Sequence, residues 1–311
     1  MPSPETQSQV EFYKRLNGYI MSGSFTLDLN RDISENFSSL ASEPAGVTYE
    51  EDVCPGTVRP AIWCLPVGLP PSAPVILYFH GGGYSANSPS SHRKMVAHLA
   101  KRSNSRALLL DYRLAPEHQF PAQIDDALAA YQWLTDIQGV PGRQISLAGD
   151  SAGGNLAVTL ALAIKKKSLA APAAVVCFSP WIDMRLSGDA HKSNLQSDIL
   201  VFEGAMQHVV QTFVGSASLD EPLLDLLNAD YTGCPPMYLT SGGSEVFRDD
   251  AVLLADTLKR SGVEVQLKVV EGLQHVWVFM AGRAREADAT LEEAAQFIRS
   301  KWVAKMQHRF M

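Results

Sequence analysis

The sequence is poor in the features that mark several common classes of protein. Its four cysteines are widely spaced and form no Cys-x-x-Cys pair, which argues against a zinc site or a redox motif. We expect four thiols rather than disulfides. The histidines show no His-Glu-x-x-His or similar ligand spacing, so we expect neither a metal nor an organic cofactor. The net charge of −7 disfavours nucleic acid as the main partner, because nucleic-acid binding favours a basic face.

Long apolar runs are also missing. No stretch approaches the ~18 consecutive apolar residues that a membrane span needs. The first residues, Met1–Gln7, lack the basic-then-apolar order of a signal peptide. We therefore expect a cytoplasmic protein without a membrane span. Hydrophobic residues make up 46% of the 311 residues, which is enough for a sizeable core.

What the chain does contain is a regular alternation of apolar strands and amphipathic helices. Continuous apolar runs such as Val75–Phe79 are typical of strands that are buried on both faces. This alternation predicts an α/β fold, with a mostly parallel sheet flanked by helices on both faces. We expect strands at 47–53, 58–65, 75–79, 107–110, 144–148, 173–178, 237–240 and 264–270, and helices at 91–102, 125–137, 155–166, 247–260 and 283–302.

Two stretches fall outside the alternation. Apolar residues at helical spacing run through 5–22, and a second short helix is expected at 33–40. Between Trp181 and Tyr231 the chain is too long for a simple connection, so we expect an insertion there. The expected division is 1–45 as the N-terminal part of a helical cap, 46–180 as the first part of the core, 181–231 as the cap insertion, and 232–311 as the second part of the core.

A Gly-x-Ser-x-Gly pattern at Gly149–Gly153 is the strongest chemical signal. An expected strand precedes it and an expected helix follows it, and such a turn lifts a serine oxygen clear of the backbone. Ser151 is therefore the candidate nucleophile, and the amide of Ala152 is a candidate donor to a substrate oxygen. The alternative interpretation is an ordinary glycine-rich turn with a surface serine.

The order of residues along the chain selects a base and an acid for Ser151. On a sheet of this kind the partners follow as serine, acid, histidine. The histidines that follow Ser151 are His191, His208, His275 and His308. His191 and His208 fall in the expected insertion and His308 falls in the tail. His275 follows the last expected strand, where a catalytic group belongs.

The acid is expected after the strand at 237–240. Glu245 lies in the loop that follows this strand, thirty residues before His275. Asp249 and Asp250 come one helical turn later, where acidic side chains favour the start of a helix. We take Glu245 as the acid and keep Asp249 as the lesser candidate.

A glycine triplet follows the strand that ends at Phe79. Main-chain amides of Gly81, Gly82 and Gly83 could approach a ligand closely, because glycine has no side chain. Together with Ala152 these amides are candidates for an oxyanion hole, which stabilises negative charge on a substrate oxygen. Tyr84 beside the glycines and Trp181 at a strand end are expected in the pocket wall, with the core as the alternative for Trp181.

Taken together, these motifs resemble the hormone-sensitive-lipase-like branch of the α/β-hydrolases. The resemblance covers roughly residues 75–280. It rests on His80–Gly83 (His-Gly-Gly-Gly), Asp111–Glu117, Phe120–Asp126, Gly149–Asn155, and His275 after Gly272. It implies a serine esterase with an α/β-hydrolase core, an all-helical cap, and substrates with short or medium acyl chains. It also implies that Tyr112, Arg113 and Glu117 lie in a structural turn.

The chain departs from the family at the acid. The family commonly has Asp, then Pro-Leu, and then a second Asp, whereas the matching stretch here runs from Glu245 to Asp249. Glutamate is one methylene longer than aspartate and can also orient an imidazole.

These observations predict a serine carboxylester hydrolase that acts on short- to medium-chain acyl esters of small molecules. It would use a Ser-His-Glu triad and form an acyl-enzyme. An amide or lactone hydrolase of a specialised metabolite with the same triad is the alternative. A non-catalytic small-molecule receptor of the same fold would be expected to lose a triad residue. A homodimer through the edge strand at 264–270 is left open.

Overall fold

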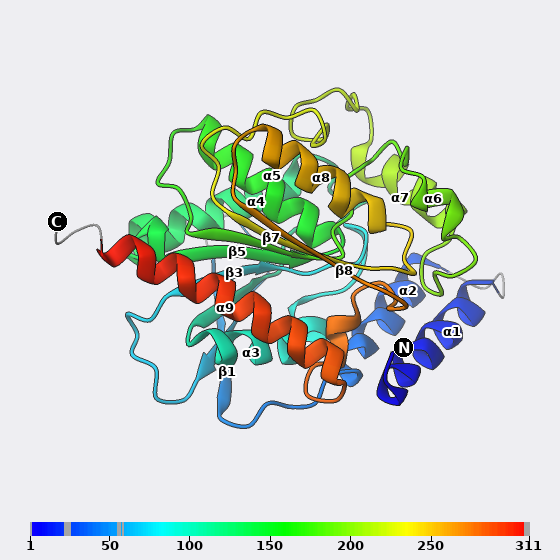
Figure 1. Ribbon diagram of the computed structural model, residues 1–311, viewed down its shortest axis with the longest axis horizontal. Coiled ribbons are helices and arrows are strands. Elements are labelled where there is room, and N and C mark those ends of the chain that lie inside the picture. The colour runs from blue at the N-terminus through cyan, green and yellow to red at the C-terminus, as the bar shows by residue number, and fades with distance from the viewer. Residues whose placement is uncertain (1, 22–25, 55–56, 58, 308–311) are drawn as a thin grey trace.

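The computed structural model describes all residues except 1, 22–25, 55–56, 58 and 308–311 (Figure 1). In this part of the chain eight strands form one sheet. The strands are β1 (Val47–Asp52), β2 (Ala61–Pro66), β3 (Val75–Phe79), β4 (Arg106–Leu110), β5 (Ile145–Asp150), β6 (Ala174–Phe178), β7 (Met237–Gly242) and β8 (Val265–Val270). The α-helices are α1 (Gln7–Met21), α2 (Leu27–Ser34), α3 (Pro89–Ser103), α4 (Ala122–Gln132), α5 (Ala152–Lys166), α6 (Ala190–Ser193), α7 (Glu203–Val214), α8 (Arg248–Arg260) and α9 (Arg285–Gln307).

The sheet is mostly parallel, which confirms the expected fold class. The strand order is β1-β2-β4-β3-β5-β6-β7-β8. The pairs β1–β2 and β2–β4 are antiparallel, and all other neighbours are parallel. Because the carboxyl ends of parallel strands lie at one edge, the segments that follow β3, β5, β6, β7 and β8 meet there. β8 is an edge strand, and the homodimer through it stays a prediction.

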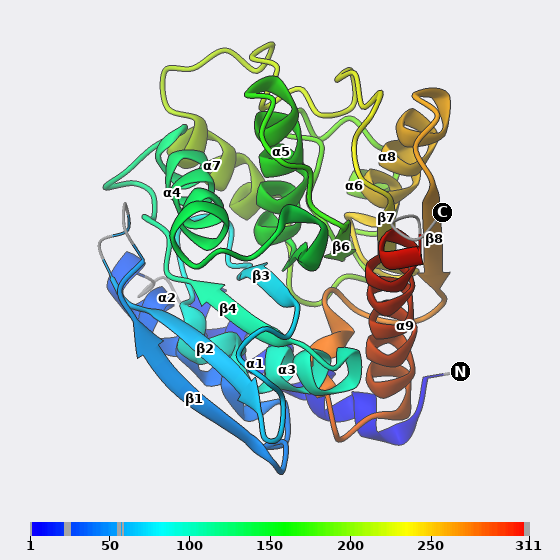
Figure 2. The ribbon, with the colours of Figure 1, turned by 90° about the vertical axis from the view of Figure 1, so that its left-hand side faces the viewer.

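Helices cover both faces of the sheet (Figure 2). α3 and α9 lie on one face, and α4, α5 and α8 lie on the other. Strand β3 packs against the helices on both faces, because successive residues of a strand point to opposite faces of the sheet. Val75, Leu77 and Phe79 pack into the core on the α5 side. Ile76 and Tyr78 pack into the core on the α3 and α9 side.

The remaining helices, α1, α2, α6 and α7, gather at one end of the sheet (Figure 1). Contacts of Arg31 and Asp250 tie the N-terminal segment and the chain after β6 to the rest of the structure. Arg31 of α2 forms an ion pair with Glu117 at 2.7 Å, and its Nε donates to the carbonyl of Ser85 at 2.9 Å. Asp250 of α8 accepts the amides of Ile182 and Asp183 at 2.6 and 2.8 Å.

Most expected elements occur within a few residues of their expected bounds, and the N-terminal segment differs most. The helix expected at 33–40 is instead α2 at Leu27–Ser34, followed by the 3-10 helix Glu35–Ser39. Thr26 sets the start of α2, because its side chain accepts the amide of Leu29. Val58 and Ser22, at the ends of two expected elements, lie outside the described residues. The four cysteines are thiols, as expected. None of the helices in the described ranges has the length and apolar character to cross a membrane.

The turn between β5 and α5 requires glycine at two positions. A Cβ on Gly153 would lie 2.0 Å from the carbonyl oxygen of Phe79, and a Cβ on Gly149 would lie 2.2 Å from the carbonyl oxygen of Gly153. Both neighbours are backbone atoms, which cannot rotate away as the end of a side chain can. The two glycines therefore allow helix α5 to start directly against the end of β3.

We expect Gly153→Ala to lower the free energy of unfolding by about 3 kcal/mol, because the new methyl group overpacks a rigid contact. Gly18→Ala is the matched control. A Cβ at Gly18 meets nothing within 4 Å, and the residue lies exposed in α1, so this change should raise stability by about 0.5–1 kcal/mol. Urea unfolding followed by circular dichroism measures both values. Equal stabilities for Gly153→Ala and the wild type would contradict the prediction.

Candidate active site

A cavity of about 670 Å³ opens at the carboxyl edge of the sheet. Ser151, His275 and Trp181 line it. Gly82 and Gly83 line it as well, and they belong to the segment His80–Gly83 after β3, which we call the glycine loop. Most of its other walls are apolar and come from the N-terminal segment and from the stretch after β6. They include Leu16, Leu27, Phe37, Met206 and Val209. Phe247, which follows β7, is a further apolar wall residue. The strand ends thus supply polar groups to a mostly apolar chamber, which is the usual composition of a small-molecule site.

Ser151 occupies a strained turn between β5 and α5. Its backbone dihedral angles are φ 53° and ψ −122°, a conformation that costs on the order of 1–3 kcal/mol and persists only where neighbours hold it. The neighbours are backbone groups of adjacent strand ends. The amide of Ser151 donates to Phe178 at 3.0 Å, and its carbonyl accepts the amide of Trp181 at 3.1 Å. The residue is 8% exposed and lines the cavity.

Glu245 and His275 form a buried pair, and His275 lines the same cavity as Ser151. Nδ1 of His275 lies 2.7 Å from Oε2 of Glu245. The other carboxylate oxygen accepts the amide of Gly242 at 2.9 Å and the hydroxyl of Ser241. The carboxylate is fully buried, so these bonds fix its orientation and that of the imidazole. Since Nδ1 is engaged by Glu245, Nε2 is the nitrogen available to a group in the cavity.

The environment of His275 favours its charged form. Burial alone would lower the pKa of His275, but the hydrogen bond and the negative charge of Glu245 outweigh it, with Asp198 adding to the effect. The net result is a raised pKa. An imidazolium that forms here is therefore stabilised more than it would be in water.

Asp249 lies away from this pair. Its Oδ2 accepts the amide of Ala190 at 2.7 Å, and its Oδ1 pairs with Arg248 at 2.9 Å. The lesser candidate for the acid therefore anchors helix α6 and has no contact with His275. Among the other histidines, His191 pairs with Asp250 at 2.9 Å and His208 lines the cavity from α7. His308 lies outside the described residues.

The amides of Gly81, Gly82 and Gly83 were all expected to be free for a substrate oxygen, and the amide of Gly81 differs from this expectation. The amide of Gly81 points at Asp150, with its nitrogen 3.2 Å from Oδ1, and it also lies 3.3 Å from Nε2 of His92. The amides of Gly82 and Gly83 have no acceptor among the described residues, and both glycines line the cavity. Gly81 is thus used to hold the loop, and this donor is not available to a ligand.

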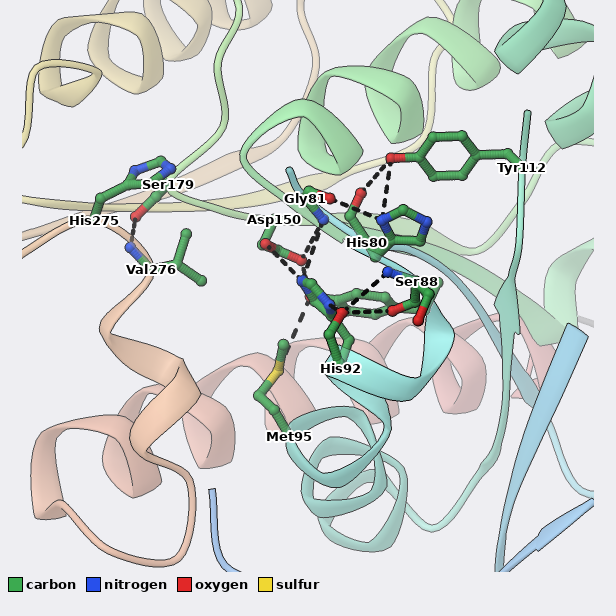
Figure 3. A network of polar contacts seen from close by, with 12 residues as sticks. His80, Gly81, Ser88, His92, Met95, Tyr112, Asp150, Ser179, His275 and Val276 are labelled. Carbon is green, nitrogen blue, oxygen red and sulfur yellow. Dashed lines mark hydrogen bonds and ion pairs between the residues drawn. The ribbon is translucent and has the colours of Figure 1, made fainter. Parts of the chain in front are cut away.

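Asp150 stands directly before Ser151 in the Gly149–Gly153 pattern, but the sequence predicted no role for it at the site. Its buried carboxylate accepts the hydroxyl of Tyr78 at 2.8 Å and lies 3.2 Å from Nε2 of His92 (Figure 3). Burial alone would raise the pKa of Asp150, but His92 and the hydrogen bond from Tyr78 lower it below its ordinary value. The carboxylate therefore stays ionised and holds the glycine loop against the turn of Ser151.

His80 at the start of the loop is a structural residue. Its ring stacks on Tyr112 with the centroids 4.3 Å apart, and the hydroxyl of Tyr112 donates to the carbonyl of His80 at 2.6 Å (Figure 3). Burial lowers the pKa of His80 to about 3, and the nearby His92 adds to the shift. His80 is therefore neutral at physiological pH and supports the loop by packing.

The two aromatic residues expected in the pocket wall have different positions. Trp181 lines the cavity and stacks on Phe247, with ring centroids 5.2 Å apart. Tyr84 is buried below the glycine loop, where it stacks on Phe213 at 3.8 Å and donates to Asn155 at 2.6 Å. Tyr84 is not among the cavity-lining residues, so the expectation for it is wrong: its hydroxyl finds a buried partner instead.

A second acidic residue near the pair comes from the stretch after β6, where no pattern marked it. Asp198 accepts the amide of Val246, next to Glu245, at 2.9 Å. It also accepts the amides of Leu200 and Val201 at 2.9 and 3.0 Å. Burial raises the pKa of Asp198. Its contacts couple the fold of this stretch to the loop that carries Glu245.

Comparison with known proteins agrees with this geometry. A family model described as alpha/beta hydrolase fold matches residues 76–279. An acetyl-hydrolase from Streptomyces hygroscopicus is 35% identical over 225 residues, which cover 72% of this chain and 75% of that protein. An ethyl acetate hydrolase from Pseudomonas putida is 32% identical and covers 70% of each chain.

Solved structures agree as well. The crystal structure of an esterase from the bacterial hormone-sensitive lipase family is 33% identical to this chain. Its TM-score is 0.90, and the match covers 97% of this chain and 99% of the other. The chain belongs to the α/β-hydrolase family, in its hormone-sensitive-lipase-like branch. It is a carboxylesterase-type hydrolase.

The geometry separates the two acid candidates. We expect Glu245→Gln to lower kcat/KM for p-nitrophenyl acetate by about 10³- to 10⁴-fold, because the amide no longer stabilises the charged imidazole. Asp249→Asn should change it less than about threefold, since the carboxylate of Asp249 bonds to the amide of Ala190 and to Arg248 and not to His275. Steady-state kinetics on the two purified variants show which substitution lowers kcat/KM more. The reverse order would assign the acid to Asp249.

Proposed function

We propose that the protein is a serine carboxylester hydrolase with Ser151 as nucleophile, His275 as base and Glu245 as the acid that orients it. The observation that carries the proposal is the buried bond of 2.7 Å between Glu245 and His275, together with a strained serine that lines the same cavity as His275. Each member follows a different strand, and the three occur in the chain order that this fold uses.

The first half of the reaction forms an acyl-enzyme. Nε2 of His275 takes the hydroxyl proton of Ser151 as the oxygen attacks the ester carbonyl carbon. Glu245 holds Nδ1 of the imidazole and stabilises the imidazolium that results. The tetrahedral intermediate collapses, the bond to the alcohol oxygen breaks, and His275 gives its proton to the departing alcohol.

The second half releases the acid. A water molecule loses a proton to Nε2 of His275 and attacks the acyl carbon. The bond to Ser151 then breaks, and His275 returns the proton to the serine oxygen. In both halves the amides of Gly82, Gly83 and Ala152 are the proposed oxyanion donors. The loss of one such donor typically costs about 3 kcal/mol of transition-state stabilisation.

The substrates we propose are esters of small molecules with short or medium acyl chains. The names of the two relatives, an acetyl-hydrolase and an ethyl acetate hydrolase, support the short end of this range. The cavity volume of about 670 Å³ and its apolar walls support acyl or alcohol groups larger than acetyl or ethyl. We further propose that residues 1–45 and 181–231 act together as the cap, because both contribute walls to this cavity.

Ser151→Ala tests the nucleophile. We expect a folded protein whose kcat on p-nitrophenyl acetate is reduced by at least about 10⁴-fold, because no acyl-enzyme can form. The wild type should also show a burst of p-nitrophenol equal to the enzyme concentration, and the variant should show none. A panel of esters, lactones and amides run on both proteins identifies the preferred bond. Retained turnover in Ser151→Ala would refute the assignment.

The pH profile tests the base. Only the neutral imidazole accepts a proton, so kcat/KM should fall as the pH drops through the pKa of His275. Because that pKa is raised, the fall should begin above pH 6.5. In Glu245→Gln the negative charge is gone, and the midpoint of the fall should move to lower pH. Rate profiles between pH 4 and 9 on both proteins measure the two midpoints, and a flat profile would exclude His275.

A further inference from the structure

The backbone carbonyl of His275 lies against two side chains of the N-terminal helix. The hydroxyl of Tyr13 donates to it at 2.8 Å, and Nε2 of Gln9 lies 3.2 Å from the same oxygen. Gln9 also contacts the carbonyl of Val276 at 3.1 Å and the hydroxyl of Tyr13 at 2.7 Å. Tyr13 and Gln9 are 0% and 1% exposed, so water does not compete for these bonds.

The backbone that these side chains hold is strained. Val276 has φ 50° and ψ 50°, the left-handed region that β-branched residues avoid. Its amide donates to the hydroxyl of Ser179, at the end of β6, at 3.0 Å (Figure 3). Gln9 and Tyr13 therefore hold the His275–Val276 segment from its carbonyl side, and Ser179 holds it from the amide of Val276. Strain of this kind persists only where the surroundings fix it, and it is common at functional sites.

The position of the imidazole depends on this segment. Glu245 fixes Nδ1, while the backbone fixes the Cα–Cβ bond from which the ring extends. With both ends held, the ring keeps one direction next to the cavity that His275 and Ser151 both line. Burial raises the pKa of Tyr13 well above its ordinary value, so its hydroxyl keeps the proton that it donates.

We propose that Tyr13, with Gln9 as its partner, is a positioning residue for His275. The helix that supplies it is 262 residues away in the sequence. The proposal rests on the proposed function, in which His275 is the base. Loss of the Tyr13 hydroxyl lets the strained peptide relax, which moves Nε2 relative to the oxygen of Ser151. Binding of the ester in the cavity changes little, because neither Tyr13 nor Gln9 lines the cavity.

Tyr13→Phe removes the hydroxyl and keeps the ring. We expect kcat on p-nitrophenyl butyrate to fall about tenfold while KM stays within about twofold, since a small misplacement of a catalytic group is costly for the chemical step. Gln9→Leu should show the same pattern, and the double variant should lose about 10²-fold in kcat. If Tyr13→Phe does not fold, Gln9→Leu decides the question by the same criterion.

Tyr231→Phe is the matched control. Tyr231 is also fully buried, and its hydroxyl also donates to a backbone carbonyl, that of Leu226 at 2.9 Å. A purely structural role for Tyr13 predicts that both variants lose thermal stability and that neither loses kcat below its melting range. An unchanged kcat in Tyr13→Phe, or a loss matched by Tyr231→Phe, overturns the proposal.

His275→Ala separates this outcome from a failure of the proposed function. If His275→Ala retains the turnover of the wild type, His275 is not the base, and both proposals fail. If His275→Ala is inactive and Tyr13→Phe behaves as wild type, the proposed function stands and only the positioning role is refuted.

Discussion

The buried carboxylate of Asp150 holds the turn of Ser151 and the glycine loop at a fixed distance from each other. It stands next to Ser151 in the chain, and it binds the amide of Gly81, the first glycine of the loop. A carboxylate that is this deeply buried is tolerated only when hydrogen-bonding partners replace the lost water, and the hydroxyl of Tyr78 and the imidazole of His92 are these partners. The separation between Ser151 and the amides of Gly82 and Gly83 therefore depends on one residue of the turn itself.

This arrangement explains why the residue types around the turn are so restricted. A Cβ on Gly81 would lie 2.4 Å from Oδ2 of Asp150, so the loop approaches the carboxylate only because this position is glycine. On the other side of the loop, a Cβ on Gly83 would lie 3.1 Å from a methyl group of Val209 in α7. The glycine loop is thus packed between the strand edge below and α7 above.

Much of the fold and the chemical groups of the site could be predicted from the sequence, because the signals are local. The apolar run Val75–Phe79 marks a buried strand wherever it occurs. Ser151, Glu245 and His275 each follow a strand, and parallel strands bring their carboxyl ends to one edge. The order of elements was therefore enough to predict that residues so far apart in the chain come together.

The contacts of individual side chains with residues distant in the sequence could not be predicted. The helical spacing around Tyr13 indicated a buried face, but periodicity does not say that this face meets the His275 loop. Tyr84 was expected in the pocket because of its neighbours in sequence, yet its positive φ of 59° and its bond to Asn155 turn it into the core. Asp198 lies in a stretch without any repeating pattern, so only its three backbone amide partners reveal its role.

The cavity walls and the proposed catalytic groups come from different parts of the chain, so the specificity of the enzyme can be changed separately from these groups. Leu16 and Leu27 precede the first strand, and Met206 and Val209 lie between β6 and β7. None of them belongs to a strand or to the loops that carry Ser151, Glu245 and His275. Substitutions there reshape the chamber without touching the pair of Glu245 and His275. A combinatorial library for new ester specificities should therefore concentrate on these wall positions, and its members should keep the reaction while the accepted acyl and alcohol groups change.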